Sequence, residues 1–216
     1  MLLEPRYTIG ETASYLGVSS STVTAWTRPR ADRTALVTAL DGERYPIPFV
    51  GLAEGLVLAA FGEAGLASRR VDSALAAVVA ALEGPHPLAQ ERFRVEGPGL
   101  LRDDASLRGD RQLQLLTVQR GSKRMFHDVI ESYLDGIEYE DGIAARVTLP
   151  ITDRPLLIVD PRRAFGAPIF IRGGTRWVDV NARIRAGEDA AAVAEDFGVS
   201  IADVREALAL PLRIAA

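Results

Sequence analysis

The pattern of apolar and polar residues predicts a short helix near the start of the chain. Thr8 and Glu11 have the spacing of a capping box, in which each side chain bonds the backbone N–H of the other residue. Gly17 can adopt the left-handed backbone that ends a helix, and Val18 closes the turn that follows. The apolar positions on one face of this helix are Ile9, Ala13 and Leu16.

A second helix is predicted directly after this turn. Ser19 or Ser20 begins it, and Val23 and Trp26 are its buried positions. Two helices joined by a glycine turn within about 20 residues are typical of a helix-turn-helix. The alternative is an ordinary helical hairpin within a core.

The exposed face of the second helix favours the DNA-binding interpretation. It offers hydroxyl groups and one arginine, with no acidic residue, and such donors suit base edges and phosphates. We therefore expect contacts with a major groove from Ser20, Ser21, Thr22, Thr24 and Arg28.

Two extended runs follow, at residues 35–40 and 44–48, with Asp41-Gly42 between them. This dipeptide is a strong hairpin signal, and a hairpin directly after a helix-turn-helix is a wing. Arg44 would lie on the wing and contact phosphate. Two further helices are predicted at 50–61 and 68–82, and Gly51 and Gly55 suggest a close helix contact in the first of them.

The remainder of the chain is predicted to contain a middle region of mixed strands and helices, followed by a helical C-terminal region. Residues 84–112 are rich in Gly, Pro, Asp and Arg and are interpreted as an irregular connection with short strands. Further strands are predicted at 113–118, 144–149 and 156–159, with an amphipathic helix at 124–134. Near the C-terminus we expect a β-hairpin and then helices at 178–186, 190–197 and 201–208.

The last two helices again have helix-turn-helix spacing. Their expected core positions are Ala194, Phe197, Val199, Val204 and Leu208. The fold class is therefore α+β, in three parts: a winged helix-turn-helix at 1–84, a connecting α+β region at 85–155, and a hairpin with a trihelical domain at 156–216.

Composition narrows the class of protein. The chain has 216 residues, 48% of them hydrophobic and 25% charged, which is ordinary for a globular protein. It has no cysteine, so disulfide frameworks and cysteine metal sites are excluded. No signal peptide is visible, and the longest apolar run, residues 74–82, is about half of a membrane span. We expect a soluble, cytoplasmic protein.

Catalytic chemistry has little support in the sequence. His127 and Glu131 have the helical spacing of two metal ligands, but no third ligand is evident, so we interpret His127 as a residue at a helix edge. His86 lies between two prolines and is interpreted as structural. No glycine-rich phosphate loop follows a strand. We expect no enzyme, no cofactor and no bound metal.

Charge is unevenly distributed near the C-terminus. Residues 162–185 contain six arginines and one acid, whereas residues 188–206 contain six acids and one arginine. The second helix-turn-helix would present acids to DNA, which repels them. These acids are Glu195, Asp196, Asp203 and Glu206. The N-terminal unit is therefore predicted to bind DNA, and the C-terminal unit to bind protein or dimerise; two DNA-binding heads are a weaker alternative.

Two family resemblances match this division. Residues 7–26, with Arg44-Tyr45, residues 63–66 and residues 71–75, resemble the N-terminal domain of MerR-like regulators, without their long dimerising helix and effector cysteines. The C-terminal segment resembles a small domain found mainly in bacterial antitoxins. Its marks here are Asp160-Pro161, Gly166-Ala-Pro168-Ile169, Gly174-Thr175-Arg176 and Ala186-Gly187-Glu188.

Together these parts resemble a VapB-family antitoxin of a type II toxin–antitoxin pair. The resemblance implies that the protein, as a homodimer, binds a cognate VapC-type ribonuclease toxin of the PIN class and represses its own operon by binding operator DNA. The alternative is a stand-alone MerR-like transcription regulator without a toxin partner.

Inhibition of such a toxin suggests a role for the arginines near the C-terminus. A PIN active site is a cluster of carboxylates, which an arginine fork binds bidentately. The candidate toxin-binding residues are Arg162, Arg163, Arg172 and Arg176, on the predicted hairpin and its flank. Alternatively, these arginines neutralise the six acids of 188–206 within the same domain.

Overall fold

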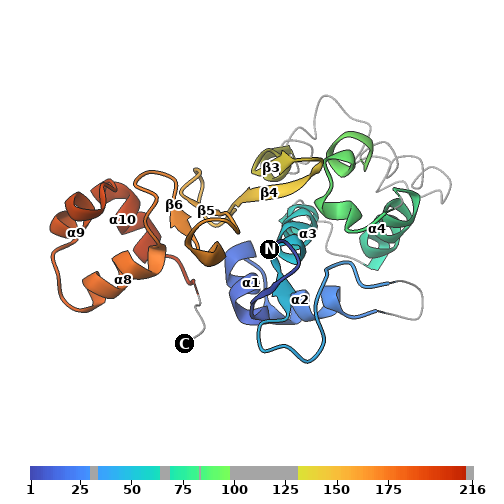
Figure 1. Ribbon diagram of the computed structural model, residues 1–216, viewed down its shortest axis with the longest axis horizontal. Helices are drawn as coiled ribbons and strands as arrows, with labels where there is room; N and C mark the ends of the chain where they lie inside the picture. Colours follow the sequence, from blue (N-terminus) through green and yellow to red (C-terminus); the bar gives the residue numbers. More distant parts are fainter. Residues whose placement is uncertain (30–33, 64–68, 83, 98–130, 213–216) are drawn as a thin grey trace.

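The computed structural model describes residues 1–29, 34–63, 69–82, 84–97 and 131–212, and it has an α+β architecture (Figure 1). Helices α1 (Ile9–Leu16) and α2 (Ser20–Thr27) lie beside the buried helix α3 (Phe49–Phe61). Strands β1 (Pro5–Tyr7) and β2 (Ile47–Pro48) pair antiparallel, so the residues just before α1 lie beside the residues just before α3. Helix α4 (Arg69–Ala81) follows.

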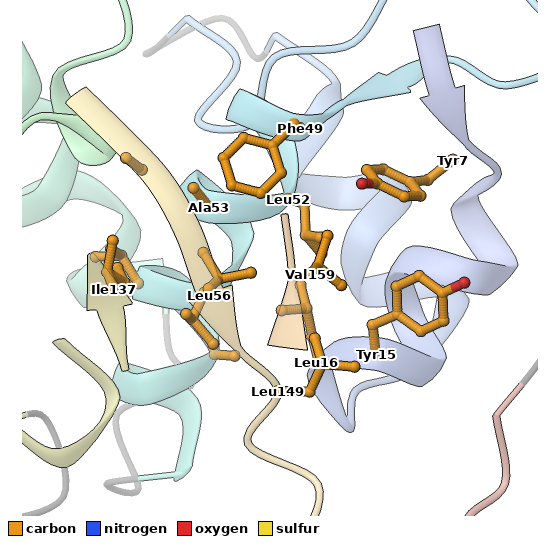
Figure 2. Packing of buried hydrophobic residues seen from close by; sticks show 14 of the residues in the cluster. Tyr7, Tyr15, Leu16, Phe49, Leu52, Ala53, Leu56, Ile137, Leu149 and Val159 are labelled. Carbon is orange, nitrogen blue, oxygen red and sulfur yellow. The ribbon is translucent and has the colours of Figure 1, made fainter. Parts of the chain in front are cut away.

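Helix α3 is the centre of the core. All of its residues are buried, because its sequence is apolar on every side and includes a single charged residue, Glu54. It packs against α1 on one side and against strand β4 on the other (Figure 2). As expected, its glycines permit close contacts: a Cβ on Gly51 would lie 2.4 Å from the Thr38 carbonyl oxygen, and one on Gly55 would lie 2.7 Å from Leu16.

A four-stranded antiparallel sheet occupies the middle of the molecule. Its strands are β3 (Ile137–Glu140), β4 (Ile143–Thr148), β5 (Leu157–Val159) and β6 (Ile169–Phe170), in consecutive order. Asp141 and Gly142 join β3 to β4, both at positive φ, as a two-residue hairpin turn requires. The strands predicted at 144–149 and 156–159 are confirmed, whereas β3 was not predicted.

Three helices form the C-terminal end, on the far side of the sheet from α4 (Figure 1). They are α8 (Trp177–Arg185), α9 (Ala190–Phe197) and α10 (Ile201–Leu208), close to the predicted bounds. Phe197 was expected at the centre of this unit, but it is only half-buried. The central aromatic residue is Trp177, which is 5% exposed and donates from Nε1 to the Ala207 carbonyl at 2.9 Å.

The wing differs from its prediction. A turn does occur at Asp41-Gly42, and the Leu40 N–H donates to the Pro46 carbonyl at 2.8 Å, but no strand ladder extends from it. Pro46 and Pro48 have no N–H to donate, so a regular ladder cannot form along this run. Instead, the Leu36 and Val37 N–H groups donate to the Trp26 carbonyl, and both side chains are buried.

The described part of the connection after α4, residues 84–97, is more regular than predicted. A 3-10 turn, η2 (Pro87–Ala89), leads into a helical segment at residues 91–97, where an irregular connection with short strands was expected. The strand predicted at 113–118 lies outside the described residues. Of the helix predicted at 124–134, the described residues 131–134 are helical, and the segment continues to 135.

Candidate DNA interface and the charged C-terminal surface

The first helix of the helix-turn-helix is fixed at both ends by its own sequence. The Thr8 hydroxyl accepts from the Glu11 N–H at 3.0 Å, and the Glu11 carboxylate accepts from the Thr8 N–H at 2.8 Å. This reciprocal capping box confirms the prediction. Gly17 ends the helix at φ 68°, and the Val18 N–H donates to the Ala13 carbonyl. The geometry of the turn fixes where α2 begins.

Helix α2 presents the polar face that the sequence predicted. Ser19 caps the helix by accepting from the Thr22 N–H at 3.1 Å, and Val23 and Trp26 point into the core. Ser20, Ser21 and Arg28 are exposed, while Thr22 and Thr24 are half-buried. The helix contains no acidic residue, so nothing on its exposed face repels a phosphate backbone.

Hydroxyl groups on α2 are already oriented by bonds within the helix. The Ser19 hydroxyl lies 2.8 Å from that of Ser21 and 2.7 Å from that of Thr22, and the Thr24 hydroxyl donates to the Ser20 carbonyl at 2.9 Å. A hydroxyl that donates to the backbone still has an oxygen that can accept a bond from a base. The side chains therefore have few rotamers to lose when they bind.

Arg44 lies on the exposed turn after Asp41-Gly42, with its guanidinium 5.3 Å from the centre of the Tyr45 ring. Stacking on an aromatic ring limits the positions of the guanidinium without removing its charge. The predicted place of Arg44 beside the helix-turn-helix is compatible with a phosphate contact, although the turn is not a β-hairpin wing.

A buried carboxylate, which the sequence did not indicate, holds the segment that follows α2. Glu54 of α3 is 3% exposed and accepts from the Thr38 N–H at 2.6 Å and from the Thr38 hydroxyl at 3.1 Å. His86 Nδ1 lies 2.9 Å from the same hydroxyl and 3.3 Å from the Glu54 carboxylate. These groups border a hollow of about 340 Å³ that also contacts Thr27 at the end of α2. His86, which was expected to be structural, contacts both Thr38 and Glu54 here.

Four of the six acids at 188–206 are paired with arginines. Arg154 contacts Asp203 at 2.5 Å and Glu206 at 2.6 Å, and Arg183 contacts Glu188 and, at 2.8 Å, Asp196. The hydrogen bond from Arg183 lowers the pKa of the Glu188 carboxyl below its ordinary value.

Asp203 was predicted on the exposed face of α10, but it is buried beside Arg154. Its N–H also donates to the Ser200 hydroxyl, which caps α10. The acids at 188–206 therefore repel DNA less than their number suggests.

Two of the four candidate toxin-binding arginines form ion pairs within the chain. Arg162 bonds Glu140 at 2.6 Å and Asp160 at 3.3 Å, and Arg176 bonds Asp179 at 2.7 Å. Among the residues that the structure describes, no ion pair involves Arg163 or Arg172. None of the ion pairs seen joins any of the four to the acids at 188–206; the ion pairs seen for those acids are made by Arg154 and Arg183.

Within the described ranges, no group of three or more His, Asp or Glu side chains is arranged to hold a metal ion. His127 lies outside those ranges, so its predicted pairing with Glu131 is not part of the described structure. No helix of the described part of the chain is both long and apolar enough to cross a membrane.

This chain is similar to a family model, to a protein from Mycobacterium tuberculosis and to a crystal structure. A family model described as "Putative DNA-binding HTH domain" matches residues 5–75. A Mycobacterium tuberculosis (strain ATCC 25618 / H37Rv) protein named "Putative antitoxin VapB45" is 33% identical over 222 residues, which cover 94% of this chain and 92% of that protein. The crystal structure of Rv2018 from Mycobacterium tuberculosis is similar at a TM-score of 0.79 and 34% identity, covering 95% of this chain and 97% of that one.

Proposed function

This chain belongs to the family of the Mycobacterium tuberculosis protein named "Putative antitoxin VapB45", and from that premise we propose that it is the antitoxin of a type II toxin–antitoxin pair. It binds and inhibits a cognate VapC-type ribonuclease of the PIN class. It also represses its own operon by binding operator DNA, and it acts in the cytoplasm without catalysing a reaction.

The observation that carries this proposal is the exposed face of α2. Helix α2 follows a glycine turn, anchors Val23 and Trp26 in the core, and exposes serines and Arg28 with no acid beside them. Hydroxyl and guanidinium donors on the second helix of a helix-turn-helix suit a major groove. We assign base or phosphate contacts to Ser20, Ser21, Thr22, Thr24, Arg28 and Arg44.

The toxin-binding surface is assigned to the arginine-rich segment after β5. Arg162, Arg163, Arg172 and Arg176 would contact the carboxylates of the toxin, since a guanidinium remains charged at any relevant pH and binds carboxylates bidentately. In this assignment residues 1–84 bind DNA, residues 85–155 connect, and residues 156–216 bind toxin or dimerise. Two DNA-binding heads on a homodimer would contact half-sites separated by whole helical turns.

The test is to express the chain with the protein encoded by the adjoining reading frame of its operon. We expect a stable complex, loss of ribonuclease activity in that complex, and a specific shift of the operon's promoter DNA. Promoter binding without any complex would identify a stand-alone transcription regulator instead. A complex that does not bind the promoter would refute autorepression.

A further inference from the structure

Phe165 is the most exposed of the large apolar side chains that the structure describes, at 88%. It lies in the 3-10 turn η3 (Ala164–Gly166), which follows the buried Asp160. Ala164 has φ 49° and Phe165 has φ 54°, so two successive residues with side chains occupy the left-handed region. Residues with side chains are strained in this region. Because the Phe165 ring is exposed, its burial does not compensate for this strain.

The loop is held firmly in this strained shape. The Asp160 carboxylate accepts from the Arg162 N–H at 2.9 Å, and the Gly166 N–H donates to the Arg163 carbonyl at 2.8 Å. From β1, Arg6 donates to the Phe165 carbonyl at 2.6 Å and the Tyr7 hydroxyl donates to the Gly166 carbonyl at 3.0 Å.

The contact between Tyr7 and Gly166 is reinforced by its surroundings. Burial raises the pKa of the Tyr7 hydroxyl, so it remains a donor. A Cβ on Gly166 would lie 2.5 Å from that hydroxyl, which leaves room for glycine alone. The ring of Phe165 is therefore displayed at the surface by a rigid support.

Arg163 precedes Phe165 by two residues, and its guanidinium has a defined position. A Cβ on Gly174 would be 2.6 Å from Nη2 of Arg163, so this guanidinium rests on the turn that also bears Ile171 and Arg172. In the described part of the chain neither arginine has an ion-pair partner, and Ile171 is 44% exposed. An exposed aromatic ring on the same segment as arginines that have no ion-pair partner among the described residues resembles the anchor residues of protein interfaces, which are enriched in aromatic residues and arginine.

We propose that Phe165 is the anchor with which this chain enters an apolar pocket on the ribonuclease toxin, while Arg163 and Arg172 bind carboxylates at the rim of that pocket. The proposal rests on the proposed antitoxin function and adds the residue that provides the apolar contact. It also divides the arginines, because Arg162 and Arg176 already have acidic partners within the chain.

Charge favours an acidic partner over a second copy of this chain. If the axis of a symmetric dimer passed through this surface, Arg163 and Arg172 of one copy would approach the same residues of the other, and like charges in an interface oppose association. A toxin whose active site is lined with carboxylates has the complementary charge. Nucleic acid would also attract the arginines, so the experiment must measure DNA binding as well.

The experiment measures the affinity of the full-length chain for the purified wild-type ribonuclease of the adjoining reading frame and, separately, for promoter DNA. Calorimetric titrations at fixed salt would compare wild type with Phe165→Ala and with the double variant Arg163→Ala, Arg172→Ala. Matched controls are Val95→Ala, at an apolar side chain that is 76% exposed, and Arg205→Ala, at an exposed arginine of α10. Circular dichroism melting verifies that each variant folds.

We expect Phe165→Ala to weaken toxin binding by about 30-fold, which corresponds to about 2 kcal/mol. The double arginine variant should weaken it about 10-fold and reduce its salt dependence, while both controls remain within about twofold of wild type.

Three results would overturn the proposal. If the wild-type chain binds the toxin and Phe165→Ala binds it equally well, the anchor is wrong and the antitoxin function stands. If the wild-type chain does not bind the toxin, the proposed function and this inference both fail. If Phe165→Ala instead weakens only promoter binding or only self-association, the surface has a different partner.

Discussion

Replacing Glu54 tests whether one buried carboxylate holds the segment that follows the DNA-binding helix. Glu54 is 3% exposed and accepts two hydrogen bonds from Thr38, at 2.6 and 3.1 Å, with His86 Nδ1 at 3.3 Å. A hydrogen bond to a charged group contributes about 1.5–3 kcal/mol to stability. Counting the two Thr38 bonds alone, we expect Glu54→Ala to lower the free energy of unfolding by about 3–6 kcal/mol.

The assay is urea unfolding followed by circular dichroism, with Glu43→Ala as the control because Glu43 is exposed. Glu54→Gln should lose less than Glu54→Ala, since the amide keeps one oxygen that can accept from the Thr38 N–H. Promoter affinity should fall with Glu54→Ala, because the same segment bonds the Trp26 carbonyl at the end of α2. If Glu54→Ala and Glu43→Ala differ by less than about 1 kcal/mol, the carboxylate does not hold this segment.

The remaining predictions concern the two helical units. Trp177→Ala should lower the free energy of unfolding by about 3–5 kcal/mol, and Phe197→Ala should lower it clearly less, as measured by thermal unfolding. Equal losses would contradict the assignment of Trp177 as the central aromatic residue of the C-terminal helices. Trp26→Ala should abolish promoter binding and leave toxin affinity unchanged, whereas simultaneous loss of both would indicate one cooperative fold. Arg28→Ala combined with Thr24→Ala should weaken promoter binding at fixed salt, and unchanged affinity would remove these residues from the interface. The Glu188 carboxyl should titrate in NMR below its ordinary pKa and return to it in Arg183→Gln; because its folded pKa is depressed, this pair stabilises the fold above the unfolded pKa and loses that effect as pH falls through the folded value.

Two Asp-Gly pairs show what local sequence could and could not predict. Asp41-Gly42 was expected to make a hairpin and makes only a turn, since Pro46 and Pro48 remove ladder donors. Asp141-Gly142 was not predicted as a hairpin turn and joins β3 to β4, where the flanking residues all have an N–H. The dipeptide sets the turn, but the flanking residues decide whether strands follow.

The helices of both helix-turn-helix units were predictable because their caps are local. Thr8, Ser19 and Ser200 each bond an N–H within three residues, so a short window of sequence contains the whole signal. Fold class and the DNA-binding unit follow from such signals.

Contacts between distant segments could not be predicted in this way. Glu54 meets Thr38 and His86 only after α3 has packed against the segment behind α2. Arg154 reaches Asp203 across a separation that no spacing rule describes, so the charge of α10 was misjudged. The exposure of Phe165 depends on backbone strain, which an apolar residue in a sequence does not reveal.

The junction between β1 and α1 limits how the length of this chain can vary. Tyr7 bonds the loop that displays Phe165, and the very next residue, Thr8, caps the first helix of the DNA-binding unit. No residue separates the two that make these contacts. A single inserted residue at this point would break one of them, so relatives that keep both should show no insertions or deletions between these two positions.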